Sequence, residues 1–353
     1  MTYSIITPAD NADFFAQFKT FVVSAGWTID AQSDTELYIH SGTTYLSFRM
    51  GDIYCTRANA LSWTSQESLS TIFFTCAINT GYDSTKDFFN QPGSSINNIN
   101  VSSAYSFNTV TYPKTMHALY CNNITEAVFV ADGNNIIIRV RRGALILNSL
   151  IITKMTKAYS FSGGLIVSSS EVLHSTAATA GSASTNKWLF PNYCRWQGQV
   201  YPFEFGARTS LSNNSYIVQS QFCTSFLING EWVLSNANPS TIMFLTNIIS
   251  NIASTTIQAK ATYLLDTILG LGASMYSGLS TLISPQFFYT NGAGSYFYCG
   301  AIEKLYLTAK TNLVDKQTLN YGAKEYLILN LLRSTDQSGY ITIDSTHFLA
   351  VEL

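Results

Sequence analysis

Apolar residues near the start of the chain recur at the spacing of an α-helix. Within residues 8–25, "PADNADFFAQFKTFVVSA", one apolar stripe is formed by Phe14, Phe15, Phe18, Phe21 and Val22. Asp10 or Asn11 can cap the start of this helix, and Gly26 can end it in the left-handed conformation that glycine favours. The pattern predicts an amphipathic helix that packs one face on a core.

Strand-like patterns follow the helix and continue through most of the chain. Polar and apolar residues alternate on either side of "SGTT" at 41–44, which predicts a hairpin. The turn "DGNN" at 132–135 lies between β-branched runs, and "NGE" at 229–231 separates two further runs. The last strands are expected in "KLYLTAK", "KEYLILNLLR", "GYITIDS" and "HFLAVEL". We therefore expect a mostly β, α+β protein with the amino-terminal helix packed on an antiparallel sheet.

Two segments interrupt the strand pattern. Residues 175–187, "STAATAGSASTNK", are small and polar, and predict a linker or loop. This segment separates a helix-plus-antiparallel-β module over 1–174 from a β-rich assembly domain over 188–353. Residues 240–284 are apolar at helical spacing and predict a helical insertion in the second module. The candidate interface on one broad face of that insertion consists of Ile242, Leu245, Ile248, Ile249 and Ile252.

The apolar insertion has two interpretations. We expect helices packed in the centre of an oligomer, because the longest wholly apolar run is too short to span a membrane. Residues 263–283 carry a single charge, which leaves an interfacial, membrane-active segment as the alternative. The first interpretation predicts no membrane contact.

Composition restricts the kind of surface that the protein can have. Charged residues make up 11% of the chain, against a usual quarter, and aromatic residues make up 14%. A chain with so little charge is expected to be poorly soluble as a free monomer. An uncharged polar surface rich in tyrosine suits a subunit that buries itself against neighbours. A secreted or surface β-protein can share this composition and is the alternative.

The basic residues do not suggest a nucleic-acid partner. The densest cluster is Arg139, Arg141 and Arg142, and the net charge of the chain is −2. Binding to nucleic acid needs many phosphate contacts. Arg139 and Arg141 alternate along a predicted strand and therefore share one face. We expect that face to be a solvated or subunit-facing edge.

Local motifs indicate no catalytic, cofactor-binding or metal-binding residues. The stretch "SFSGGLIVSSS" at 160–170 lacks the spacing and the lysine of a phosphate-binding loop, and predicts a turn. The four histidines are far apart and form no metal or protease motif, and "DGNN" lacks the later acidic ligands of a calcium loop. Paired acids from remote strands could still form a glycosidase site. We expect no enzyme activity, no cofactor and no bound metal.

The six cysteines are widely spaced, and none forms a CxxC pair of the kind that binds zinc. Each lies among apolar or aromatic residues, so we expect buried free thiols rather than three disulfides. They are Cys55, Cys76, Cys121, Cys194, Cys223 and Cys299.

Four stretches of the chain resemble segments of one group of known proteins. They are "FFAQFKTFVVSAGWTID", "TELYIHSGTTYLSFRMGDIYC", "AVFVADGNNIIIRVRRGALILNSLIITKMTKAYSFSGGLIVSSS" and "KEYLILNLLRSTDQSGYITIDSTHFLAVEL". In this order they resemble the opening helix, the hairpin, the strand pair with its glycine turn and the closing strands of a group of proteins. That group comprises tail and other virion structural proteins of double-stranded DNA bacteriophages. The chain departs from it at Leu329 and Asn330, in place of Phe and Pro, and at Arg142-Gly143-Ala144, in place of Phe-Gly.

The resemblance implies a structural role in the virion, in the tail or baseplate, with other virion proteins and copies of the chain itself as partners. Such a subunit mediates contacts between subunits and can seat receptor-binding fibres. Two alternatives stay open. One is a carbohydrate- or receptor-binding β-module, which adds a host surface glycan as a partner. The other is a glycan hydrolase.

Overall fold

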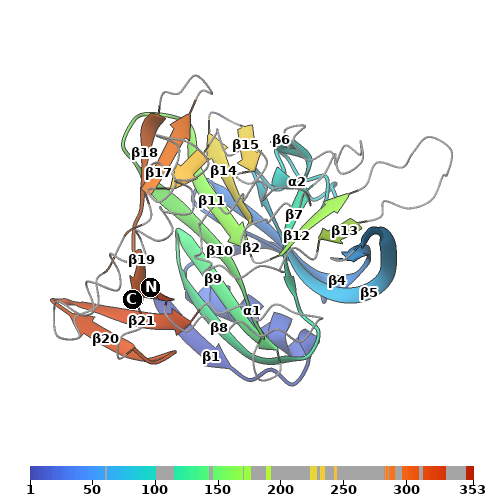
Figure 1. Cartoon of the computed structure of the whole chain (residues 1–353), viewed down its shortest axis with the longest axis horizontal. Helices are drawn as coiled ribbons and strands as arrows, with labels where there is room; N and C mark the ends of the chain where they lie inside the picture. Colours follow the sequence, from blue (N-terminus) through green and yellow to red (C-terminus); the bar gives the residue numbers. More distant parts are fainter. Residues whose placement is uncertain are drawn as a thin grey trace.

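In the computed structural model, the described residues form three β-sheets and two helices (Figure 1). The described residues are 1–59, 62–100, 115–142, 146–169, 171–175, 188–191, 223–228, 231–234, 242–244, 282, 284, 286–290, 296–309, 313–330 and 347–353. The prediction of a mostly β, α+β protein is confirmed. The helices are α1 (Asn11–Ser24) and the short α2 (Ser95–Asn98).

The largest sheet, called the central sheet below, has 11 strands. They are β1 (Thr2–Ile6), β6 (Ile99–Asn100), β8 (Ile124–Asp132), β9 (Asn135–Arg142), β10 (Ile146–Lys157), β11 (Gly163–Ser169), β14 (Cys223–Ile228), β15 (Glu231–Leu234), β16 (Ile242–Phe244), β17 (Gln286–Thr290) and β18 (Tyr296–Ile302). Its main path runs β1-β8-β9-β10-β11-β14-β15-β6, and β18 joins it through β10.

Two further sheets flank the central sheet. The seven strands of the amino-terminal sheet are β2 (Thr28–Gln32), β3 (Glu36–Ser41), β4 (Thr44–Asn59), β5 (Ser62–Asn79), β7 (Thr115–Tyr120), β12 (Glu171–Ser175) and β13 (Trp188–Pro191). The four strands of the carboxyl-terminal sheet are β19 (Leu305–Ala309), β20 (Thr318–Tyr321), β21 (Lys324–Asn330) and β22 (His347–Glu352).

Helix α1 forms where the apolar stripe predicts it. The Asp10 carboxylate caps its start by accepting the N–H of Asp13 at 2.8 Å. At its end, Gly26 takes a φ of +95°. The N–H groups of Gly26 and Trp27 reach back to the carbonyls of Val23 and Val22, which is a Schellman motif. The buried face of the helix consists of the five residues that the sequence predicts: Phe14, Phe15, Phe18, Phe21 and Val22.

The central sheet is covered on both faces. On one face, α1 and the amino-terminal sheet enclose a core in which the Phe18 ring lies 5.0 Å from Phe48, 5.2 Å from Phe74 and 5.5 Å from Phe129. On the other face, the carboxyl-terminal sheet packs on β8, β9 and β10 (Figure 1). The second core includes Val128, Val130, Ile137, Ile151, Leu327, Leu349 and Val351. A strand buried on both faces explains why β9 reads as a continuous β-branched run.

The three predicted hairpins are present. Two residues connect β3 to β4, and two connect β8 to β9, with antiparallel pairing on either side of each turn. Strands β14 and β15, which lie on either side of "NGE" in the sequence, pair antiparallel. "GYITIDS", at 339–345, lies outside the described residues, whereas the other three closing stretches form β19, β21 and β22.

The turn predicted at Gly163-Gly164 is instead the start of strand β11. Both glycines have positive φ, and the register against β14 shifts between Gly163 and Ile166, as in a β-bulge. A Cβ at Gly163 would lie 2.2 Å from the Leu227 carbonyl oxygen. The glycine is needed because the neighbouring strand approaches the backbone there.

The helical prediction for 240–284 is wrong at its first candidate residue. Ile242 lies in strand β16, where it pairs with Tyr289 of β17. The short run Ile242–Phe244 is apolar and begins with a β-branched residue, so it suits a strand as well as a helix, and its periodicity cannot separate the two. The other candidates, Leu245, Ile248, Ile249 and Ile252, lie outside the described residues.

Strands from both predicted modules share the central sheet. Strand β11 of the first module pairs with β14 of the second, and β10 pairs with β18. The division into modules at 175–187 stays a prediction, because nearly all of those residues lie outside the described ones. Of the cysteines, Cys76, Cys121 and Cys299 are buried and not joined in disulfides, and burial raises the pKa of the Cys76 thiol far above its ordinary value. The side chains of Cys55, Cys194 and Cys223 are outside the described set.

Candidate functional site

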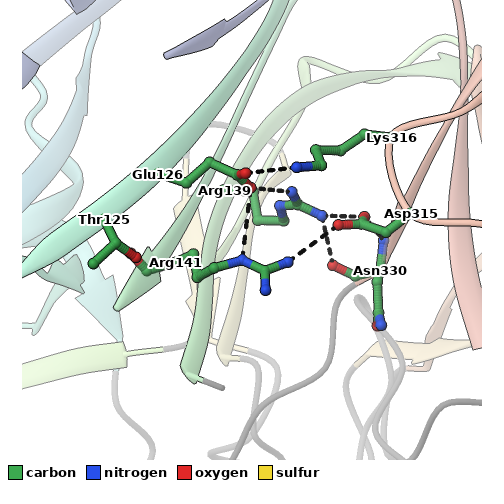
Figure 2. Close-up of polar contacts among 7 residues, drawn as sticks. All are labelled: Thr125, Glu126, Arg139, Arg141, Asp315, Lys316 and Asn330. Atoms are coloured by element: carbon green, nitrogen blue, oxygen red, sulfur yellow. Dashed lines mark hydrogen bonds and ion pairs between the residues drawn. The ribbon is translucent and has the colours of Figure 1, made fainter. Parts of the chain in front are cut away.

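A cluster of charged side chains lies between the central sheet and the carboxyl-terminal sheet (Figure 2). Strand β8 contributes Glu126 and strand β9 contributes Arg139 and Arg141. The turn before β20 contributes Asp315 and Lys316. Three cationic and two anionic groups meet, and they come from segments more than 170 residues apart. We refer to these five residues as the charge cluster.

Arg139 is the centre of the charge cluster and is fully buried. Its neighbours across the sheet are Val128 on β8 and Ser149 on β10. Arg139 therefore lies on the face of the central sheet that also carries Val128 of the second core. The expectation that Arg139 and Arg141 form a solvated or subunit-facing edge is therefore wrong for Arg139, which is buried against Asp315 and Asn330 of the same chain. The shared face was predicted, but it is the face that the carboxyl-terminal sheet covers.

Both carboxylates bridge two or more cations. Glu126 accepts hydrogen bonds from Arg139 at 3.0 Å and from Lys316 at 2.6 Å. Asp315 accepts from Arg139, from Arg141 at 3.4 Å and from the N–H of Asn330 at 2.8 Å. The Asn330 carbonyl also accepts from Arg139 at 3.2 Å. The rigid fork of the arginine thus joins β8 on one side to the turn and β21 on the other.

A tight turn holds Asp315 and Lys316 in place. Lys316 has a φ of +67°, in the left-handed region that non-glycine residues adopt at a cost of about 1 kcal/mol or more. Its N–H donates to the Ile328 carbonyl at 2.7 Å, and the Ile328 N–H donates to the Gln317 carbonyl at 2.9 Å. These bonds to β21 keep the strained conformation and direct the two side chains toward β8 and β9.

The energetics of the charge cluster favour specificity over net stability. Taking charges out of water costs several kcal/mol for each ion, and a good ion pair roughly offsets this. Among the described residues, the buried Nε of Arg139 has no hydrogen-bond partner, so the compensation is incomplete. Removal of one partner is costly because it leaves the others uncompensated. We therefore expect the charge cluster to fix how the carboxyl-terminal sheet sits on the central sheet.

A second ion pair joins the same two sheets at the "DGNN" turn. The Lys304 ammonium donates to Asp132 at 2.8 Å, and the Asp132 carbonyl accepts from the Trp27 indole at 2.8 Å. Burial alone raises the pKa of the Asp132 carboxyl. The hydrogen bonds from Lys304 and from the turn lower it by more, so the pKa lies below its ordinary value of 3.8. This turn therefore connects all three layers.

Two histidines form polar contacts within the sheets. His117 on β7 lies 2.6 Å from the hydroxyl of Ser169 on β11, and both side chains are buried. This pair links the amino-terminal sheet to the central sheet. His40 lies 2.8 Å from Asp30 and stacks on Tyr45 at a centroid distance of 5.2 Å. The side chains of His174 and His347 are outside the described set.

Sequence reasoning identified only part of the charge cluster. The alternation of Arg139 and Arg141 was the one local signal, and it gave their shared face correctly. Glu126 and the adjacent pair Asp315 and Lys316 belong to no recognisable motif. The predicted interface residues of 240–284 play no part in the charge cluster as far as the structure describes them.

Neither a metal site, nor a membrane span, nor a comparison with known proteins identifies a function within the described residues. Within the part of the chain that the structure describes, no group of histidine, cysteine and acidic side chains could hold a metal ion. No helix among the described residues is long and apolar enough to cross a membrane. No protein-family model matches the chain, and no curated protein matches its sequence.

Proposed function

We propose that this chain is a structural subunit of a double-stranded DNA bacteriophage virion, placed in the tail or baseplate. In this role it binds copies of itself and other virion proteins and holds them together. Its layered sheets supply a rigid body, and its surface, which is poor in charge, supplies the contacts. No catalytic group is needed for such a role.

The observation that carries the proposal is the shortage of charged residues in the chain. The chain has 19 basic and 21 acidic residues among 353. Five of these charges lie in the charge cluster between two sheets, and Arg139 is fully enclosed. The remaining surface has little charge with which to stay apart from other proteins. A subunit locked in an assembly does not need that repulsion.

Exposed apolar side chains support the same role. Among the described residues, the large apolar side chains that stay exposed are Tyr3, Ile5, Val23, Tyr159, Val314 and Tyr321. Three of the six are tyrosines, a residue enriched in protein interfaces because it combines apolar area with a polar tip. The choice of a phage particle, and of its tail, rests on the resemblance of the four sequence stretches.

Immunogold electron microscopy of phage particles whose genome encodes the chain tests this function. We expect antibodies raised against the purified protein to label the tail end of intact or gently disrupted particles. Label confined to the head would leave a virion protein and overturn the tail placement. Absence of the protein from both the images and a denaturing immunoblot of the same particles would overturn the structural role.

A further inference from the structure

Strand β1 forms one edge of the central sheet. It pairs antiparallel with β8, from Thr2 opposite Ala131 to Ile6 opposite Ala127, without a register shift. Among the described residues, no strand pairs with its other side. A regular edge of this kind presents a row of backbone N–H and C=O groups that can pair with another strand.

The sequence of β1 lacks the usual protection of an edge strand. Exposed edges are commonly guarded by lysine or other charges, by proline or by a bulge. Strand β1 reads "TYSII", with no charge and no proline, and its pairing contains no bulge. An edge strand without these protective features, in a protein with few charged residues, favours pairing with another strand when the protein is assembled.

Two exposed apolar side chains accompany this edge. Tyr3 is 40% exposed and Ile5 is 43% exposed. They lie opposite Val130 and Val128 of β8, which belong to the core beneath the carboxyl-terminal sheet. The apolar face of the central sheet thus continues out to β1, where the carboxyl-terminal sheet leaves it partly uncovered.

Strand β1 is complementary to itself. If two copies pair antiparallel about a two-fold axis at Ser4, Tyr3 lies opposite the partner subunit's Ile5, and Ile5 lies opposite the partner subunit's Tyr3. Aromatic and β-branched residues form one of the favourable cross-strand pairs. The strand is uncharged, so this arrangement places no like charges opposite each other.

We propose that β1 pairs with β1 of a second copy, in the register centred on Ser4, and joins two central sheets into one. This contact rests on the proposed role as a subunit that binds copies of itself. A two-fold contact uses the same patch on both subunits, as isologous interfaces do. Five residues on each side give a small contact, so it acts together with other contacts of the assembly.

Disulfide trapping of the full-length protein tests both the contact and its register. In a Ser4→Cys variant the two new thiols face each other, at a Cα separation that a disulfide accepts for either type of antiparallel pair. We expect oxidation to give a covalent dimer on a non-reducing gel. The wild-type protein, treated in the same way, controls for the native cysteines.

A Thr2→Cys variant is the matched control, because Thr2 would lie opposite the partner subunit's Ile6. Thr2 is more exposed than Ser4, so random collisions would cross-link it more readily. Adding Ile5→Lys to Ser4→Cys places a positive charge on the edge strand and should abolish the dimer. Circular dichroism checks that the variant is folded. Cross-linking of Thr2→Cys as strongly as Ser4→Cys, no dimer from Ser4→Cys, or a dimer that survives Ile5→Lys would overturn the pairing.

The pairing and the virion role can fail separately. A Ser4→Cys dimer from a protein that is absent from phage particles would retain the pairing and reject the virion role. A protein present in the particles whose Ser4→Cys variant links there only to a different protein would retain the role and reject self-pairing.

Discussion

The two faces of the central sheet are held by different forces. On one face, α1 and the amino-terminal sheet pack through aromatic rings, with Phe18 in contact with three other phenylalanines. On the other face, the carboxyl-terminal sheet packs on an apolar core that the charge cluster interrupts. Apolar packing is strong but not directional, whereas ion pairs and hydrogen bonds demand one alignment.

This difference assigns separate roles to the two faces. The aromatic face supplies stability, because burial of a large side chain contributes about 1.5–3 kcal/mol. The charged face selects one position for a sheet whose apolar side chains could also pack after a small displacement. We therefore expect the loss of one charge to affect the carboxyl-terminal sheet more than the other layers.

The largest effect is expected on the aromatic face. Replacement Phe18→Ala should lower the free energy of unfolding by about 3–5 kcal/mol, because it leaves a cavity among packed rings. Urea unfolding measures this change. The exposed Val23 on the same helix is the matched position, and Val23→Ala should stay within about 0.5 kcal/mol of wild type. Equal effects at the two positions would contradict the packing described for α1.

The next effect is expected on the charged face. Replacement Asp315→Ala leaves Arg139 buried with one carboxylate fewer, and should cost about 3 kcal/mol. Hydrogen exchange should show where the loss occurs, with faster exchange in β19 to β22 and little change in α1. Phe18→Ala should give the opposite distribution.

The exposed Glu325 on β21 provides the control for Asp315, since both are acids of the carboxyl-terminal region. Glu325→Ala should leave both stability and exchange near the wild-type values. If Asp315→Ala speeds exchange equally in α1 and in β19 to β22, the two faces do not respond independently, and the comparison fails.

A smaller effect is expected from the ion pair at the "DGNN" turn. The folded-state pKa of Asp132 is depressed, so its contribution to stability is complete above its ordinary pKa of 3.8 and is lost as the pH falls through the lower folded-state value. Replacement Lys304→Met removes the hydrogen-bonding cation and should cost less than about 1 kcal/mol at pH 7.

The pH dependence isolates this contribution. Between pH 7 and pH 3, the wild type should lose more stability than Lys304→Met. In the variant the pKa of Asp132 is depressed less, so protonation of this carboxylate removes less stabilisation. Parallel urea titrations at the two pH values make the measurement. An identical loss in both proteins would show that the Lys304 contact does not stabilise the ionised carboxylate.

The two faces also differ in how well the sequence predicts them. The stripe from Phe14 to Val22 is local, so its periodicity is sufficient to predict the helix and its buried face. The sequence narrows the cap to Asp10 or Asn11, and the structure shows that it is Asp10. The hairpins at "SGTT" and "DGNN" are local in the same sense. Antiparallel neighbours joined by two-residue turns leave little freedom for another pairing.

The charge cluster could not be predicted in the same way. The alternation of Arg139 and Arg141 gives a shared face, but Asp315 lies 176 residues after Arg139. No spacing rule connects positions that far apart. The bulge at Gly163 was missed for a related reason, because it depends on the close approach of Leu227 from another strand. At Ile242 the short apolar run suited both strand and helix, and the helical interpretation was wrong.

Mass spectrometry of gradient-purified phage particles tests the central claim, the structural role in the virion, most directly. The particles must come from a phage whose genome encodes the chain. We predict that peptides of this protein co-sediment with infectious particles and keep a constant ratio to the major virion proteins through successive gradients. Peptides that remain in the soluble fraction, or whose ratio to the virion proteins falls with each gradient, would contradict a structural role in the virion.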